Sequence, residues 1–365
     1  MKLLIGETIR NLRRERNITQ EEFANVLGVT YQSVSRWENN TCYPDMELLP
    51  DIANFFGITV DKLMGVDKNA EQKEIDRYLE RFQEAVSRGA VYECIDIARE
   101  GVTAYPNNYA LLNKLMYALF LSGDDDGNIP EWRENMLKND AEITELGERI
   151  MKYCPDQDIR LEAMNRLAFN HCEMGRKEIG RRIYEKLPPM YSCRELCIWW
   201  ALDDREKLEN ARDRIRKGYH ILYNALYNLA YAQGLSDEER IKIYKKCFAL
   251  NDLIWDGCDY LTFCGWGNAR AHCGLSGIYA RTNQADKAIS ELRQAVQYAK
   301  AFDERPETAT FSALLPGKLT IYKTDFETDD SRSLSEIVRD KWLKSSDFDG
   351  IRNTIEFQSI IDELS

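Results

Sequence analysis

Two side chains near the start of the chain, Gln32 and Arg36, have the chemistry to read the edges of base pairs. A glutamine amide donates and accepts at once, which matches adenine, and a guanidinium donates two hydrogen bonds, which matches guanine. Residues four apart lie on one face of a helix. The pair therefore predicts contact with the major groove of a duplex, provided that the segment is an exposed helix.

The residues around this pair predict such a helix. Thr30 is suited to be its N-cap, and Val34 and Trp37 fall together on the opposite face. An aromatic residue at helical spacing with valine is typical of a hydrophobic core, so Trp37 is expected to be buried. The polar face would then point outward and enter the groove with its N-terminal end first.

A second short helix is predicted immediately upstream. Thr19 and Glu22 have the spacing of a capping box, and Gly28 stops the helix that the box opens. Ala24 supplies the small residue that a steep helix crossing needs, and Gly28 tolerates the positive φ of a tight turn. This is the spacing of a helix-turn-helix.

The same segment holds further helical patterns. Apolar residues share one face of a first helix that ends near Asn17, and two more helices are predicted before Leu63, with Pro50 in the first turn of one of them. Four arginines crowd the end of the first helix and predict a local basic patch: Arg10, Arg13, Arg14 and Arg16.

The runs 18–24, 27–30, 34–39 and 43–45 resemble the Cro/phage-repressor (XRE) family of DNA-binding domains, over about 60 residues. The resemblance implies a five-helix, lambda-repressor-like domain that binds double-stranded DNA. Asn40 stands where the family usually has glycine, and asparagine also tolerates a left-handed turn. The candidate DNA-binding residues are Gln20, Thr30, Tyr31, Gln32, Ser33, Arg36 and Asn39.

Family and chemistry divide these candidates into two groups. Tyr31, Gln32 and Arg36 are expected to reach bases, whereas Gln20, Ser33 and Asn39 match positions that touch phosphates in the family and would position the helix without specifying sequence. For any one of them the alternative is a solvated polar side chain with no contact to DNA.

The rest of the chain predicts helix after helix and no competing strand pattern. Among 365 residues there are only 20 glycines and 9 prolines, which favours long helices. The spacing of Pro155 and Pro188 and the turn-like segments 174–179 and 281–289 resemble TPR-like α-solenoids with degenerate repeats. The expected fold is all-α: a DNA-binding domain at 1–66, a linker at 67–75 and a TPR-like helical repeat domain at 76–365.

One predicted helix carries a row of side chains that suits a peptide ligand. Tyrosines recur every four residues from 219 to 231, beside a row of histidine and asparagine. The candidate ligand-binding residues are His220, Asn224, Tyr227 and Asn228, because amides hold a peptide backbone and tyrosines offer rigid contact area. Packing between layers of the solenoid is the alternative explanation for the row.

Composition excludes several functions. The net charge of −12 argues against a protein that coats nucleic acid or an anionic membrane, and no apolar run is long enough for a membrane span. Ten cysteines without C-x-x-C spacing indicate reduced, mostly buried thiols. No phosphate-binding, dinucleotide or zinc-protease motif occurs, so we expect no metal, no cofactor and no enzyme, in a soluble cytoplasmic protein.

Together these patterns predict a sequence-specific transcriptional regulator. One recognition helix reads few base pairs, so a homodimer on a palindromic operator is expected, with half-sites about 34 Å or a multiple apart. The solenoid would dimerise and sense an effector, as in peptide-responsive regulators of similar architecture. The alternative is an interaction scaffold, for example a mobile-element immunity or toxin-control factor whose solenoid binds a protein partner.

Overall fold

The computed structural model describes residues 5–65, 68–125, 128–190 and 193–364, and the chain forms two compact units. The first unit comprises Met1–Glu80 and the second Arg81–Ser365. Helix α6 (Lys68–Ser87) covers most of the range expected to be a linker. The domain boundaries at residues 66 and 75 stay a prediction, and the two units are described separately.

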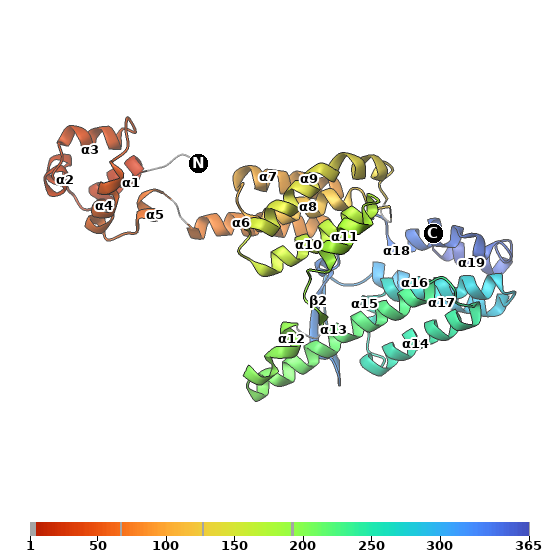
Figure 1. Ribbon diagram of the computed structural model, residues 1–365. Coiled ribbons are helices and arrows are strands. Elements are labelled where there is room, and N and C mark those ends of the chain that lie inside the picture. The colour runs from red at the N-terminus through yellow and green to blue at the C-terminus, as the bar shows by residue number, and fades with distance from the viewer. Residues whose placement is uncertain (1–4, 66–67, 126–127, 191–192, 365) are drawn as a thin grey trace. The chain divides into compact units, whose positions relative to one another are not determined.

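The first unit contains the five predicted helices (Figure 1). They are α1 (Ile5–Glu15), α2 (Gln20–Leu27), α3 (Tyr31–Glu38), α4 (Leu49–Phe56) and α5 (Val60–Leu63), with a short 3-10 turn, η1 (Met46–Leu48), before α4. Because these helices carry the candidate DNA-binding residues, we call residues 5–65 the head.

Local chemistry sets the boundaries of the head's helices. Thr19 and Glu22 form the predicted capping box of α2, and Gly28 ends that helix with φ of 67°. The Thr30 hydroxyl accepts the Ser33 N–H and so caps α3. Asn40 has φ of 55°, the left-handed turn for which asparagine was expected to replace glycine.

The core of the head is formed by one face of each of its five helices. Trp37 is only 5% exposed and packs with Phe23, Val34 and Ile52, which confirms its assignment to the core. Ala24, at the crossing of α2 and α3, is also buried. The polar face of α3 is left outward.

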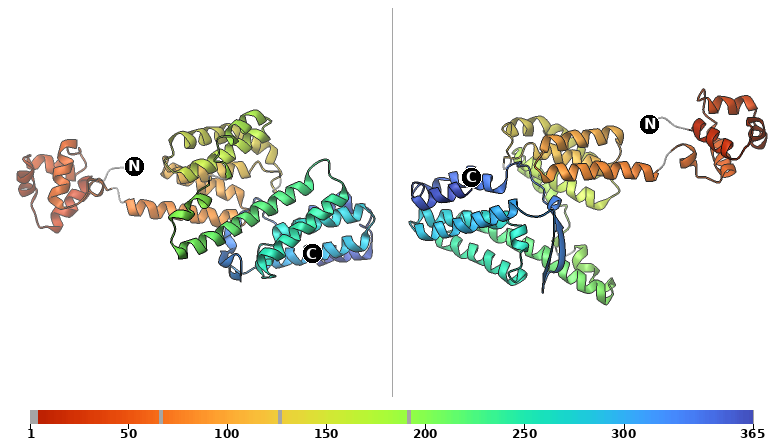
Figure 2. Two further views of the ribbon diagram at one scale, coloured as in Figure 1. Left: turned by 60° about the horizontal axis from the view of Figure 1, so that its bottom comes forward. Right: turned by 180° about the vertical axis from the view of Figure 1, so that it is seen from behind.

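The second unit is a succession of helices in which neighbours pack as pairs (Figures 1 and 2). The succession of helices expected from the sequence is confirmed for most of this unit. The helices that follow α6 are α7 (Val91–Ala104), α8 (Tyr109–Leu121), α9 (Trp132–Tyr153), α10 (Gln157–Glu173), α11 (Lys177–Tyr184), α12 (Arg194–Cys197), α13 (Asp204–Tyr231), α14 (Asp237–Trp255), α15 (Tyr260–Phe263), α16 (Trp266–Arg281), α17 (Ala285–Asp303), α18 (Leu334–Asp340) and α19 (Ile355–Glu363).

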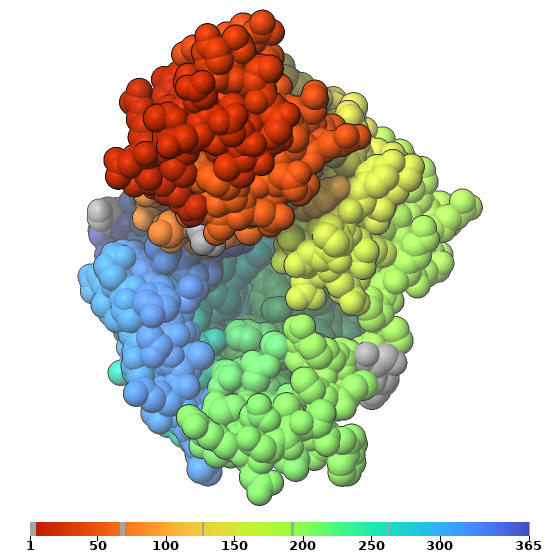
Figure 3. Space-filling view, turned by 90° about the vertical axis from the view of Figure 1, so that its left-hand side faces the viewer, coloured from red at the N-terminus to blue at the C-terminus, as the bar shows by residue number. Residues whose placement is uncertain are grey.

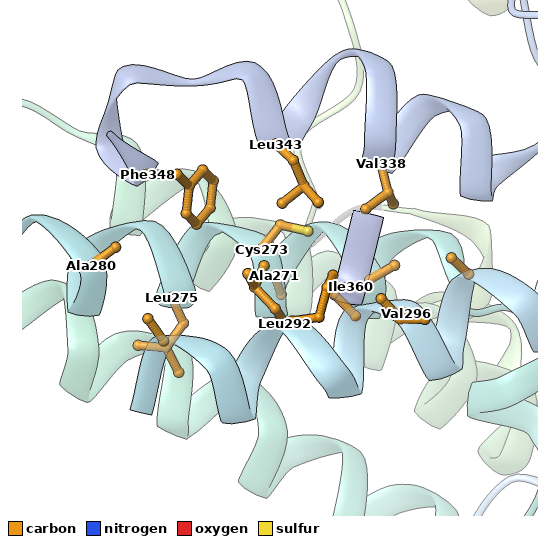
Figure 4. Packing of buried hydrophobic residues seen from close by; sticks show 14 of the residues in the cluster. Ala271, Cys273, Leu275, Ala280, Leu292, Val296, Val338, Leu343, Phe348 and Ile360 are labelled. Atoms are coloured by element: carbon orange, nitrogen blue, oxygen red, sulfur yellow. The ribbon is translucent and has the colours of Figure 1, made fainter. Parts of the chain in front are cut away.

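The largest hydrophobic cluster lies in the C-terminal part of this unit. Figure 4 shows Cys273 of α16 and Leu292 of α17 covered by Val338 and Leu343 from the chain that follows, with Ile360 of α19 beside them. All five are buried. The last helices therefore close the end of the solenoid by covering an apolar face that it would otherwise expose.

The expectation that no strand interrupts the helices is wrong for residues 308–322. Strands β1 (Thr308–Ala313) and β2 (Gly317–Tyr322) pair as an antiparallel hairpin, with Phe311 opposite Leu319. Phe311 is buried against aromatic residues of α15, its ring 5.7 Å from Tyr260 and 5.5 Å from Phe263. This tertiary packing, together with alternating threonines, favours strands over helix here.

The segment after the hairpin returns to the first helices of the unit. The Gln83 amide donates to the carbonyl of Thr324 at 2.7 Å, and the N–H of Thr328 donates to the carbonyl of Val86 at 3.1 Å. We call residues 323–333 the strap, because they connect α6 with the C-terminal helices.

Two further expectations concern the whole chain. In the described ranges, no helix has both the length and the apolar character needed to cross a membrane. All ten cysteines are free thiols, of which Cys94, Cys154, Cys247 and Cys273 are buried. Cys42 and Cys197 are exposed and the other four are half-buried, so the expectation that most of the thiols are buried is wrong.

Candidate functional site

One face of α3 presents its polar side chains to solvent along the length of the helix. Tyr31 is 52% exposed, and Gln32 and Arg36 are exposed as well. Neither Gln32 nor Arg36 makes a side-chain hydrogen bond or ion pair with any residue that the structure describes. Both groups therefore keep their full hydrogen-bonding capacity for an external partner.

The cap of α3 uses two of the candidate residues internally. The hydroxyls of Thr30 and Ser33 lie 3.0 Å apart, and the Thr30 oxygen also accepts the Ser33 N–H. Their side chains hold the first turn of α3 in place. Thr30 is exposed and Ser33 half-buried. Both lie at the N-terminal end of α3, which is the end expected to approach a phosphate.

A buried carboxylate, Glu38, joins the three helices around this surface. Glu38 is 2% exposed. Arg13 donates two hydrogen bonds to its carboxylate, from Nε to Oε1 at 2.6 Å and from Nη2 to Oε2 at 2.9 Å. The Gln20 amide donates to Oε2 at 2.8 Å. Arg10 donates to the Glu38 carbonyl and to Oδ1 of Asn39.

These contacts decide the charge state of Glu38. Burial by itself would raise the pKa of Glu38, but hydrogen bonds from Arg13 and Gln20 and the charges of Arg13 and Arg10 outweigh it and lower the pKa. Glu38 is therefore ionised at neutral pH. It fixes the angle between α1, α2 and α3, and thereby the direction in which α3 projects.

The predicted basic patch at the end of α1 is smaller than expected, because Arg10 and Arg13 face the buried carboxylate of Glu38 while Arg14 and Arg16 stay exposed. Arg10 donates to the carbonyl of Glu38 and Arg13 to its carboxylate. Arg16 donates to the carbonyls of Phe55 and Phe56 at 2.8 and 2.7 Å. Arg14 is exposed and has no partner among the described residues.

Gln20 and Asn39 lie at the ends of α2 and α3 and already form side-chain hydrogen bonds within the head. The Gln20 amide is held by Glu38, and Oδ1 of Asn39 is held by Arg10. Each keeps part of its amide free, since the side-chain contacts with described residues use only the Gln20 nitrogen and the Asn39 oxygen. Their assignment to phosphate contacts stays a prediction.

The residues predicted to bind a ligand on α13 are not all brought together. His220 and Asn224 line one pocket with Tyr219 and Tyr223, while Tyr227 and Asn228 lie further along the helix and outside it. The Tyr227 hydroxyl donates to that of Tyr231 at 2.9 Å.

Packing accounts for part of this tyrosine row. Tyr219 and Tyr223 are buried, and their hydroxyls donate to Asn251 at 2.8 Å and to Asn268 at 3.0 Å. Burial lowers the pKa of His220, which is therefore neutral at physiological pH, and its Nε2 lies 3.2 Å from the hydroxyl of Tyr260.

The geometry of residues 5–65 defines a helix-turn-helix DNA-binding domain, and similarity to known proteins agrees. The family model described as "Helix-turn-helix" matches residues 9–63. Over 59 residues the chain is 41% identical to the HTH-type transcriptional activator BcrR of Enterococcus faecalis, covering 16% of this chain and 29% of that protein. It is 32% identical over 87 residues to the antitoxin PezA of Streptococcus pneumoniae, covering 24% of this chain and 55% of the antitoxin.

A further relative is covered over most of its length. The chain is 33% identical over 90 residues to the cryptic phage CTXphi transcriptional repressor RstR of Vibrio cholerae, covering 23% of this chain and 80% of the repressor. The chain belongs to the helix-turn-helix family of transcriptional regulators. It spans less than two thirds of the length of BcrR and PezA.

Among solved structures, the chain is similar to Bacillus thuringiensis PlcR, crystallised in complex with the peptide PapR7 and DNA. The match has 14% identity and a TM-score of 0.33, and covers 82% of this chain and 94% of that chain. This likeness is too distant to assign a role to the helical unit.

Proposed function

We propose that the protein is a sequence-specific DNA-binding transcriptional regulator whose α3 enters the major groove. The observation that carries the proposal is the exposed, unpaired pair Gln32 and Arg36 on a helix whose other face is locked by Trp37 and Glu38. Tyr31 lies next to Gln32 in the first turn of α3. A rigid helix with free bidentate groups is what direct base readout requires.

The other candidates in the head would act on the backbone of the DNA. Gln20, Thr30, Ser33 and Asn39 surround α3 with hydroxyl and amide groups, which bind phosphate without specifying sequence. The N-terminus of α3 adds its own amide groups and dipole.

We further propose that the regulator binds a palindromic operator as a homodimer, and that the helical unit dimerises and senses an effector in the cytoplasm. One head covers few base pairs, so two heads are needed for useful affinity. An effector that favours one arrangement of the heads would change operator binding by a population shift. His220, Asn224, Tyr227 and Asn228 are the proposed effector contacts on α13, and no enzymatic activity is proposed.

Footprinting on the DNA upstream of the protein's own gene tests the DNA-binding proposal. The intact chain should protect two half-sites, and Arg36→Ala should weaken protection of that DNA. Equal binding of a scrambled duplex would overturn the proposal. The matched control is Arg293→Ala, because Arg293 is an exposed arginine of α17 in the helical unit.

A second candidate function is an interaction scaffold in mobile-element immunity or toxin control, in which the helical unit binds a protein partner. The similarity to the antitoxin PezA favours it. Co-purification of a stoichiometric protein partner encoded next to this gene, by a chain with intact α3, would support the scaffold. Operator protection that changes with a small effector alone would count against it.

A further inference from the structure

The pocket beside α13 has a volume of about 350 Å³. It is bordered by α13, by the chain from α15 to α16, by the end of α17 and by the chain from β2 into the strap. Figure 3 shows the helical unit hollowed between α13 in green and the hairpin region in blue, with teal residues at the bottom. The volume lies at the lower end of the range for small-molecule sites.

Aromatic rings form much of the pocket wall. Phe263, Trp266, Phe302 and Phe326 all line it, and the Phe326 ring lies 5.3 Å from that of Trp266 and 4.9 Å from that of Phe302. Rings at these separations and tilted angles form a fixed apolar surface. A flat apolar molecule fits such a wall better than a flexible polar chain does.

The polar groups between α13 and α16 are already satisfied by one another. Tyr223 and the Asn251 amide both donate to Oδ1 of Asn268, and Tyr219 donates to Oδ1 of Asn251. The Asn268 amide donates to the carbonyl of Leu261 at 3.4 Å. These groups stabilise the pocket and do not need a ligand.

Arg305 is different, because it is a buried cation without a counter-ion. It lines the pocket and is 9% exposed, and it forms no ion pair with any described residue. Its Nη1 donates to the carbonyl of Phe302 at 2.6 Å, and its guanidinium carbon lies 3.5 Å from the centre of the Phe302 ring. Its Nε is buried and has no hydrogen-bond partner.

Two of the three acidic residues near Arg305 in the sequence, Asp303 and Glu307, are engaged elsewhere, and the third, Glu304, is exposed and forms no ion pair with Arg305. The Asp303 carboxylate accepts the N–H groups of Leu334 and Ser335 at the start of α18, and Glu307 lies 3.6 Å from the ammonium of Lys323. Since a buried charge without a partner is costly, this cation is suited to an external anion. The free edge of the guanidinium is at Nη2, which forms no hydrogen bond with any described residue and can donate a charge-assisted hydrogen bond to a carboxylate.

The other ionisable groups of the pocket do not oppose an anion at Arg305. Asp325 also lines the pocket, but it is exposed, and one of its oxygens accepts the N–H of Tyr322 at 2.8 Å. Water screens an exposed carboxylate far more than a buried one. His220 is neutral, and it adds no charge of either sign.

We propose that this pocket binds a small aromatic carboxylic acid, with its ring against Trp266 and Phe326 and its carboxylate on the free edge of Arg305. The proposal names the chemical class of effector for the helical unit and rests, for its regulatory meaning, on the proposed function. Binding itself does not depend on DNA and is measured without it.

Calorimetric titration of the full chain with indole-3-acetate and with indole-3-acetamide tests the proposal. The two probes share a ring system, and only the first carries a charge. We expect the acid to bind at least about tenfold more tightly, since charge-assisted hydrogen bonds are about twice as strong as neutral ones. Equal affinities for acid and amide, or no binding of the acid below millimolar concentration, would overturn it.

Substitutions test whether the preference for the acid over the amide depends on Arg305. Arg305→Met should abolish the preference for the acid, and Arg305→Lys should retain part of it. Arg240→Met is the matched control, because Arg240 is an arginine outside the pocket that donates to three backbone carbonyls, and it should leave the acid-to-amide ratio unchanged. Loss of the preference in Arg240→Met as well would contradict the proposal.

The comparison of acid with amide on the unaltered chain stands even if a variant fails to fold. If the acid does not bind but the chain still protects its operator, only the ligand proposal is overturned. A normal titration without operator protection overturns the DNA-binding function alone.

Discussion

Replacing Glu38 with glutamine should destabilise the head by about 2–4 kcal/mol, although the change is nearly isosteric. The variant keeps the volume of the side chain and removes its charge. Arg13, whose side chain is 11% exposed, would then lie inside the head without a counter-ion. The Gln20 amide would lose a charged acceptor as well. The estimate is below the full cost of breaking a buried pair because a glutamine oxygen still accepts one hydrogen bond.

Hydrogen exchange of the full chain, followed by mass spectrometry, measures this effect where it occurs. A loss of 2–4 kcal/mol should speed exchange of the core amides of α1 and α3 about 30-fold to 700-fold, at 1.4 kcal/mol per factor of ten. Amides of α16 and α17 are the internal control and should not change. Exchange within about threefold of the unaltered protein in α1 and α3 would refute the reasoning.

A double-mutant cycle separates the ion pair from simple loss of packing. Arg13→Met leaves the Glu38 carboxylate buried and unpaired, so it should also be costly. The double variant Arg13→Met with Glu38→Gln should recover part of the loss, with a coupling of at least about 1 kcal/mol. Strict additivity would mean that the two groups do not depend on each other.

The same pair predicts a dependence on pH. The pKa of Glu38 is lowered in the folded head, so its contribution is fully present above its unfolded pKa, about 4.5. That contribution is lost as the pH falls through the folded pKa. The difference between the unaltered protein and Glu38→Gln should therefore be largest at neutral pH and shrink below about pH 4.

Three further predictions test other parts of the chain. Arg36→Ala should cost about 1–3 kcal/mol of specific binding at one base-pair position, which gel shifts with single-base operator variants measure; a uniform loss across sequences would make Arg36 a phosphate contact instead. Trp37→Ala should cost about 3–5 kcal/mol because it opens a cavity in the core of the head, as urea unfolding would show, whereas a loss under 1 kcal/mol would contradict the burial. Gly89→Ala should lower the thermal midpoint of the helical unit, since Gly89 has φ of 66° and a Cβ would lie 2.5 Å from the carbonyl of Asp330 in the strap. Gly175→Ala is its control, with φ of 76° but open space around it, and an equal effect of both would mean that contact with the strap is unimportant.

The features of the head that were predictable from sequence are those determined by local chemistry. The capping box at Thr19, the left-handed turn at Gly28 and the cap at Thr30 each involve residues within four positions of one another. The burial of Trp37 follows from the period of a single helix. Such signals lie within one segment of the chain, so a sequence reveals them without its fold.

The basic patch illustrates why charge is harder to place. Arg10 and Arg13 meet Glu38 across more than twenty positions, and Arg16 meets Phe55 and Phe56 across about forty. Sequence shows that the arginines cluster at the end of α1, but not that carbonyls and a carboxylate from other helices surround them. The sequence gives only a weak indication that Glu38 is buried, namely its place next to Trp37 at the end of α3.

The hairpin and the pocket depend even more on long-range contacts. Residues 308–313 alternate threonine and serine with apolar residues, which is a strand signal, but six residues among long helices are easily assigned to a turn. Arg305 follows the end of α17, and only the folded chain shows that it is buried against rings from α17 and the strap. No periodicity within one element contains that information.

The internal use of the arginines has a consequence for how the head could bind DNA. Within residues 5–65, Arg14, Arg36 and Lys62 are the cations without a partner among the described residues. If Arg36 reads a base, the cations left for phosphates are Arg14, Lys62 and the exposed Arg16, whose partners are neutral carbonyls. Three phosphate neutralisations give a salt slope of only about −3 and little affinity at physiological salt. The net charge of −12 weakens non-specific attraction further. For useful affinity we therefore expect a head of this kind to need base contacts from α3, the amides at the start of that helix, and the proposed second head on the same operator.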